Sequence, residues 1–216
     1  AAAAGAAAIT ASMAAFVVKA AHAGIAYNTL EQQSRSAFRV ILGGAEAANA
    51  MMGKVAEFAR SSPFPRQAFI SATQQLLAFG FEAENVVETL QGIENAVAAI
   101  GGNAHQIAEI TSILSDVQST GRLGIETLNM LGIRGVNAAK LIAEQMGKTE
   151  AEFRNSVFGS PLQGGEAFKA LDALIKGMNE EFAGAASGLK ATWTGAQDRI
   201  AGAIRDTGSA IVEPFI

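Results

Sequence analysis

The chain has 216 residues, a formal net charge of −4 and a hydrophobic content of 50%, which suffices for a sizeable core in one domain or two. It contains no cysteine, which excludes a disulfide framework and a thiolate metal site, and its mixed charges without long runs of one sign argue against a nucleic-acid-binding face. Alanine dominates the apolar residues, and 23 glycines with only 4 prolines are typical of helices that end at glycine.

The N-terminal segment from Ala1 to Val18 carries no charge and is about as long as a membrane span. More than half of it is alanine, which is only weakly apolar, and no basic region precedes it as in a signal peptide. A helix packed on the protein or on a partner and a genuine membrane span both stay open. Because the sequence does not begin with methionine, we expect it to be an excerpt of a longer protein.

Apolar residues then recur at intervals of three and four, which predicts amphipathic helices. In the first half of the chain we expect helices over residues 10–42, 45–60, 65–79 and 84–100. Gly43-Gly44, the prolines Pro63 and Pro65, and Gly80 separate them. After the third helix, Gly80 can adopt the left-handed conformation that caps a helix, so that Phe81 folds back onto Leu76.

Capping-box pairs mark two helix starts in the second half. Asn103 with Gln106, and Thr149 with Glu152, have the residue types and the spacing of that motif. The predicted helices of this half span residues 103–120, 125–131, 136–146, 149–158 and 166–182, followed by a helical region from 185 to about 212. We expect Gly121 and Gly147 to end helices, and residues 159–165 to form a loop.

The sequence therefore predicts an all-α fold without strands and without a regular repeat. We expect a compact multi-helix domain over residues 45–184, flanked by long helical arms: an Ala-rich one over residues 1–44 and a C-terminal one over residues 185–216. Residues predicted to form the core are Leu76, Leu77, Phe79, Phe81, Val87, Leu90, Ile93, Ile110, Leu114, Leu171 and Leu174. If Leu77 is fully buried, its replacement by alanine should lower the free energy of unfolding by about 2–5 kcal/mol.

No constellation in the sequence predicts catalysis or a cofactor. Gly147-Lys148-Thr149 looks like the end of a phosphate-binding loop, but the pattern needs a glycine at Ile142 and a preceding strand, so a helix stop followed by an N-cap is the better interpretation. The two histidines, His22 and His105, lie far apart and in no nucleophile motif. We expect no catalytic residue, no metal and no cofactor, and we place His105 near solvent in a first helical turn.

Two other patterns have ordinary structural interpretations. The adjacent carboxylates Glu180 and Glu181 point about 100° apart on a helix, which favours a solvated face over an acid–base pair. Residues 184–188 read GAASG, whose small residues permit a close helix contact. Because charged residues follow downstream, we interpret this segment as a hinge or a tight contact outside a membrane.

Six segments in a fixed order carry a resemblance to a known family. They are EFARSSPF at residues 57–64, SATQQLLAFGF at 71–81, IGG at 100–102, ILSDVQSTGRL at 113–123, LNMLGI at 128–133 and EAFKALDALIKGMNEEFAG at 166–184. In this order and spacing the chain resembles the conserved domain of bacteriophage and prophage tail tape measure proteins, over about residues 51–184. One departure is Asn129-Met130, where family members often carry an acidic residue.

The resemblance implies a structural role. Such proteins are long and helical, lie along the tail lumen while tube subunits assemble around them, set tail length, and leave ahead of the DNA. The implied partners are further copies of itself, as a homotrimer, tail tube and tail-tip proteins, tail assembly chaperones and the host membrane during ejection, but no sequence-specific nucleic acid. The implied location is the virion tail, with host cytoplasm during assembly. The family-motif residues, all structural, are Pro63, Phe64, Gln74, Gln75, Leu76, Leu77, Phe79, Gly80, Phe81, Gly101, Gly102, Gly121, Leu131, Gly132, Ile133, Met178, Phe182 and Gly184.

Two other functions compete with this hypothesis. A membrane-active helical protein, such as a pore-forming toxin, would use residues 1–18 for insertion. An enzyme such as a cell-wall hydrolase would need an acid–base pair, for which the sequence offers no plausible candidate.

Overall fold

The computed structural model describes residues 29–192, 195–197, 200 and 202–203. The uncharged segment 1–18, His22 and the end of the predicted C-terminal helical region lie outside the described residues. Residues 29–41 are helical. The helices that follow are α2 (Ala45–Ser61), α3 (Arg66–Ala78), α4 (Val86–Ala99), α5 (Ala104–Thr120), α6 (Ile125–Ile133), α7 (Ala138–Gln145), α8 (Glu150–Val157), α9 (Gly165–Glu181) and α10 (Ala185–Lys190). The prediction of an all-α fold is confirmed.

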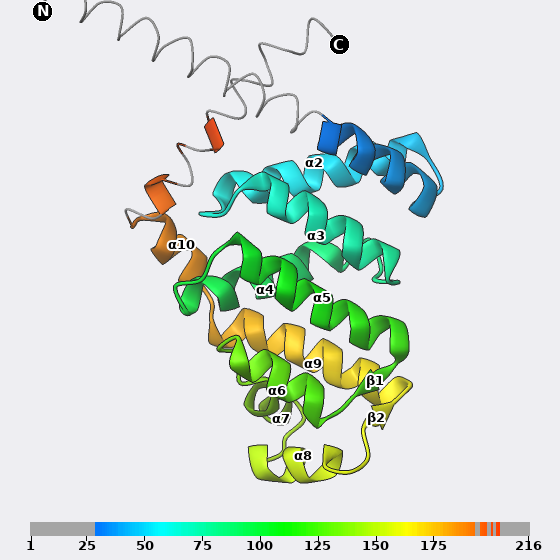
Figure 1. Ribbon diagram of the computed structural model, residues 1–216, viewed down its shortest axis with the longest axis vertical. Coiled ribbons are helices and arrows are strands. Elements are labelled where there is room, and N and C mark those ends of the chain that lie inside the picture. The colour runs from blue at the N-terminus through cyan, green and yellow to red at the C-terminus, as the bar shows by residue number, and fades with distance from the viewer. Residues whose placement is uncertain (1–28, 193–194, 198–199, 201, 204–216) are drawn as a thin grey trace, which may run out of the picture.

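The helices are stacked in layers, with the helix 29–41 and α2 at one end and α8 at the other (Figure 1). Helix α3 packs on α5, and α4 packs on α9. Helix α9 also contacts α7, so it lies between α4 and α7, two helices that precede it in the sequence. Helix α10 runs along the edge of the stack and packs on α4.

The core runs through the whole stack, and nine of the eleven residues predicted for it are buried. The prediction that Phe79 belongs to the core is wrong, because this residue is 43% exposed. It lies just past the end of α3, where Gly80 reverses the chain at φ +94°, so that Phe81 enters the core instead. Val87 is only half-buried because it lies in the first turn of α4, beside a surface groove.

Several helices end in the same way. At the end of α3, the N–H of Phe81 donates to the carbonyl of Leu76 and the N–H of Gly80 to that of Leu77, which is the Schellman motif. The same pair of hydrogen bonds ends α4, α6 and α7. Both predicted capping boxes are confirmed, at the starts of α5 and α8. These local devices explain why the helix ends were predicted to within a few residues.

A short antiparallel ladder corrects the expectation that no strand occurs. Strand β1 (Arg122–Leu123) pairs with β2 (Leu162–Gln163), which lies in the segment predicted as a loop. The N–H of Gly164 also donates to the carbonyl of Gly121 at 2.8 Å. The ladder fixes the start of α9 against the end of α5, which two residues per strand could not signal in the sequence.

The two outer segments contact the central helices. In the segment predicted as the N-terminal arm, Phe38 is fully buried and the hydroxyl of Ser34 donates to Gln74 of α3. Glu31 forms a salt bridge with Arg66 at 3.3 Å. In the predicted C-terminal arm, Ala186 is buried. The domain boundaries after residues 44 and 184 stay predictions.

Candidate functional site

The predicted chemical motifs have structural roles in the described part of the chain. Gly147 ends α7 at φ +66°, and the Thr149 hydroxyl accepts the N–H of Glu152 to cap α8, so no phosphate-binding loop forms. His105 lies in the first turn of α5 with its side chain 81% exposed. Among the described residues, no cluster of histidine and carboxylate side chains has the arrangement of a metal site.

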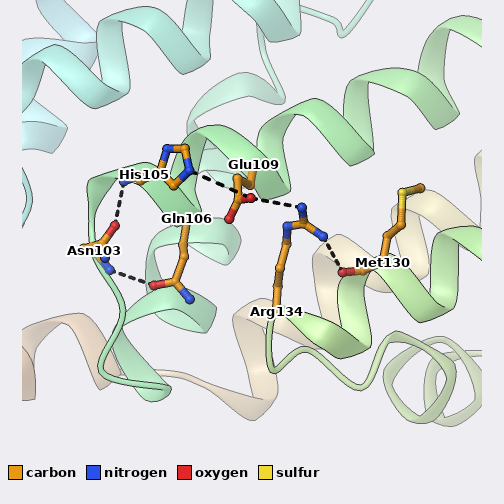
Figure 2. A network of polar contacts seen from close by, with 6 residues as sticks. All are labelled: Asn103, His105, Gln106, Glu109, Met130 and Arg134. Atoms are coloured by element: carbon orange, nitrogen blue, oxygen red, sulfur yellow. Dashed lines mark hydrogen bonds and ion pairs between the residues drawn. The ribbon is translucent and has the colours of Figure 1, made fainter.

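A polar network joins α5 to the end of α6 (Figure 2). Asn103 caps α5, and its N–H in turn donates to the side chain of Gln106. One turn further along α5, Glu109 accepts a hydrogen bond of 3.0 Å from Arg134, whose guanidinium also donates to the carbonyl of Met130 at 2.8 Å. A cation at the C-terminal end of α6 is favoured by the helix dipole. The network therefore acts as a structural clamp between α5 and the end of α6.

The adjacent carboxylates of α9 form contacts between helices. Glu181 accepts a hydrogen bond of 2.6 Å from Lys140 of α7, and Glu180 accepts one of 2.5 Å from Gln145. The Glu181 contact raises the pKa of Lys140 above its ordinary value. The two carboxylates are exposed, as predicted, but they also orient α7 on α9.

A cleft of about 420 Å³ lies between α4, the end of α5 and α9. Apolar, polar and charged side chains line it: Phe81, Glu82, Asn85, Glu88, Thr89, Gln118, Phe168, Asp172, Ile175 and Lys176. Burial, and then the charge of Glu88, raise the pKa of Asp172. The cleft therefore brings Glu88 and Asp172 close enough for their charges to interact.

A buried carboxylate, which the sequence analysis missed, lies on α4. Glu94 is 4% exposed, and its Oε1 atom has no hydrogen-bond partner in the structure. Burial raises the pKa of Glu94 to about 7, while Ser62 and the charge of Lys190 lower it by less. In the sequence, Glu94 stands among apolar residues of α4, which is the only signal that could have indicated its burial.

Comparison with known proteins identifies the family. Residues 21–209 match the family model described as tape measure protein. The chain belongs to this family. The Mu-like prophage FluMu protein gp42 of Haemophilus influenzae is 28% identical over 151 residues, which are 69% of this chain and 23% of that protein. The chain thus spans about a quarter of the length of this curated relative. No solved structure matches the chain.

The tape measure motif residues divide into helix ends and core. Gly80, Gly101, Gly121 and Gly184 all have positive φ, where other residues are strained. Beyond these turns, the buried motif residues are Pro63, Phe64, Leu76, Leu77, Phe81, Leu131 and Met178. Gln74, Gln75, Gly102 and Phe182 are half-buried, and Gly132 is exposed. The helix-end glycines and the buried residues thus have structural roles in this chain, while their assignment as motif residues of the family stays a prediction.

Two apolar motif residues are not explained by packing. Phe79 is 43% exposed and Ile133 is 85% exposed. Ile133 belongs to the last turn of α6, which the clamp of Arg134 fixes in place. Single exposed apolar residues are common on protein surfaces. The structure therefore gives these two positions no role in the isolated domain.

Proposed function

We propose that this chain is a structural domain of a longer protein in the lumen of a phage tail. In this proposal the full-length protein lies along the tail axis during assembly in the host cytoplasm, its length sets tail length, and it leaves ahead of the DNA. Membership of the tape measure family over residues 21–209 carries the proposal. The prophage origin of the relative and the stacked helices support it.

The location can be tested on purified tails of a phage that encodes this chain. Mass spectrometry should detect peptides from α3 to α9 in intact tails, and should find them depleted after DNA release is triggered. A tube protein measured in the same samples serves as the control, since it should remain. Intact tails without these peptides would contradict the proposal.

Length determination needs a separate experiment. Duplication of residues 45–184 in frame within the full-length protein should lengthen the tails seen by electron microscopy, because more chain lies along the axis. A stop codon that gives a null allele controls for tails that form without the protein. Normal tails of unchanged length would show that this domain does not contribute to the measured length.

We further propose that the domain acts with partners and not as an enzyme. Further copies of the chain, as a trimer, tail tube and tail-tip proteins, and assembly chaperones are the expected partners. Light scattering coupled to gel filtration tests the first of these, and a monomer at all concentrations would contradict self-association through this segment. Peptidoglycan turnover by the purified chain would contradict the non-enzymatic role.

Membrane insertion is the weaker alternative. In the described part of the chain, no helix combines the length and the apolarity that a membrane crossing requires. The segment 1–18 lies outside that part, so liposome binding tests it directly. An effect of Ala14→Asp on binding would favour insertion of this segment during ejection.

A further inference from the structure

The cleft between α4, the end of α5 and α9 has an excess of negative charge. Three carboxylates, those of Glu82, Glu88 and Asp172, line it beside one ammonium, that of Lys176. Lys176 forms its salt bridge with Glu180 of its own helix, at 3.8 Å. None of the three cleft carboxylates forms a salt bridge with another described residue. The cleft is therefore suited to a positively charged group from outside the domain.

Two of these carboxylates are held near one another by packed helices. Glu88 lies on α4 and Asp172 on α9, and these helices contact each other directly. Burial, and then the charge of Glu88, raise the pKa of Asp172, and no positive charge in the described part of the chain lowers it. A cation placed between two such carboxylates favours the ionised form of both. Binding of a basic side chain would thus relieve a repulsion that the fold imposes.

The cleft offers apolar surface as well as charge. Its volume of about 420 Å³ lies in the range of pockets that bind small groups. The rings of Phe81 and Phe168 line it, and Phe168 is 38% exposed. An aromatic face attracts a guanidinium or ammonium group, and long basic side chains pack their apolar stems on such surfaces. The occupant that fits this combination has apolar side chains next to a basic one.

One exposed segment of the chain has this chemistry. Arg39, Val40 and Ile41 form the end of the helix 29–41, and all three residues are exposed. Val40 is 82% exposed, and Arg39 forms no salt bridge within the described part of the chain. The helix 29–41 lies in an outermost layer of the stack (Figure 1), where another molecule can approach it. The Arg39–Ile41 segment therefore complements the cleft in both charge and apolarity.

We propose that the Arg39–Ile41 segment of one copy of the chain docks in the cleft of another copy. The guanidinium of Arg39 then lies between Glu88 and Asp172, and Val40 packs on Phe168. This contact identifies surfaces for the association of copies, so it rests on the self-association in the proposed function. Because the two surfaces differ, such contacts join copies head to tail, and three copies can close them into a ring.

Charge reversal on either surface tests this contact in the full chain. Association of the wild type, measured by light scattering over a concentration series, should weaken at high salt because the charges are screened. Arg39→Glu should weaken association at least about tenfold, and so should Glu88→Lys combined with Asp172→Lys, because like charges then meet. All three residues are exposed, so both variants should keep the circular dichroism spectrum of the wild type.

An equimolar mixture of the two charge-reversed variants is the sharpest measurement. In the mixture, each segment can meet a cleft of opposite charge on the other variant, so association should recover although neither variant associates alone. Lys148→Glu is the control, because it reverses an exposed ammonium just before α8 and changes the net charge as much as Arg39→Glu does. This control should associate as the wild type does.

Three results would overturn the contact. Charge-reversed variants that associate as the wild type does would place the self-contact elsewhere and leave the cleft to a basic segment of another protein. A mixture that stays dissociated would show that the losses did not arise from complementarity between these two surfaces. A wild type that is monomeric at every concentration would contradict both the contact and the self-association. The location of the protein in the tail would still depend only on the mass spectrometry of purified tails.

Discussion

Helices α9 and α10 both dock on α4, but by different kinds of contact. At α9 the backbones approach closely: a Cβ placed on Gly92 would lie 3.2 Å from the carbonyl oxygen of Ile175. Buried apolar side chains of α9 fill the rest of this interface. At α10 only one alanine is fully buried, Ala185 and Leu189 are half-buried, and hydrogen bonds join the helix to Asn95 and to the carbonyl of Arg60. Because the stability of a helix contact grows with the apolar area that it buries, docking of α9 should be much more stable than docking of α10.

The largest expected effect compares one leucine from each helix. Leu174 of α9 is fully buried, so Leu174→Ala should lower the free energy of unfolding by about 2–5 kcal/mol, and Leu77→Ala in α3 should behave alike. Leu189 of α10 is half-buried, so Leu189→Ala should cost less than about 1 kcal/mol. Urea unfolding followed by circular dichroism measures both. Equal losses at the two leucines would mean that α10 is an integral part of the core.

The next effect concerns pH. Because burial raises the pKa of Glu94 to about 7, the folded state holds a proton that the unfolded chain has lost, and stability falls as the pH rises from 4.5 through 7. The upper limit of this loss is about 3 kcal/mol. Subtracting the pH profile of Glu94→Gln from that of the wild type isolates this group from others, including Glu150 and Glu152, whose lowered pKa values act in the opposite direction. Parallel profiles would contradict the burial of a neutral carboxyl.

A smaller effect tests the close approach of α9 to α7. A Cβ on Gly177 would lie 2.9 Å from the Cβ of Leu141 and 3.2 Å from its carbonyl oxygen. Crowding should therefore outweigh the gain in helix propensity, and Gly177→Ala should lose about 1–2 kcal/mol. Gly53 of α2 has open space around it, so Gly53→Ala should gain up to about 1 kcal/mol. A gain at both glycines would show that the α7–α9 interface is looser than the structure indicates.

The smallest expected effect lies in a helix end outside both interfaces. Asn103→Ala removes the oxygen that accepts the N–H of His105, which should cost about 1 kcal/mol. His105 is mostly exposed, so His105→Ala should change stability by less than about 0.5 kcal/mol. Thermal unfolding of the two variants, measured side by side, would show which of the two substitutions lowers stability more. A larger loss at His105 would mean that the network of Figure 2 depends on it.

Local chemistry made much of the fold predictable. Helix ends depend on residues within six positions of one another, so a short stretch of sequence is enough to predict them. Examples are the capping boxes at Asn103 and Thr149 and the helix-ending glycines Gly80 and Gly147. The amphipathic period added the inward face of each helix. The family could also be recognised from the sequence, because six segments that resemble it stand in a fixed order along the chain.

Other features required partners from distant parts of the chain. Phe79 and Phe81 are equally apolar, and only the direction of the turn at Gly80 decides which of them is buried. The β1–β2 pair joins segments about 40 residues apart, and two residues per strand leave no periodic pattern. Gly177 resembles any helical glycine until Leu141 packs against it.

The sequence by itself determined the helical class, most helix ends and the family, since these follow from backbone propensity, capping and residue order. The tertiary structure alone decided which helices cross closely and which carboxylate is buried. The sequence shows that Glu94 is a carboxyl group on a helix, but not whether it is buried. Its raised pKa arises because the tertiary fold removes this side chain from water, which outweighs the hydrogen bond with Ser62 and the charge of Lys190.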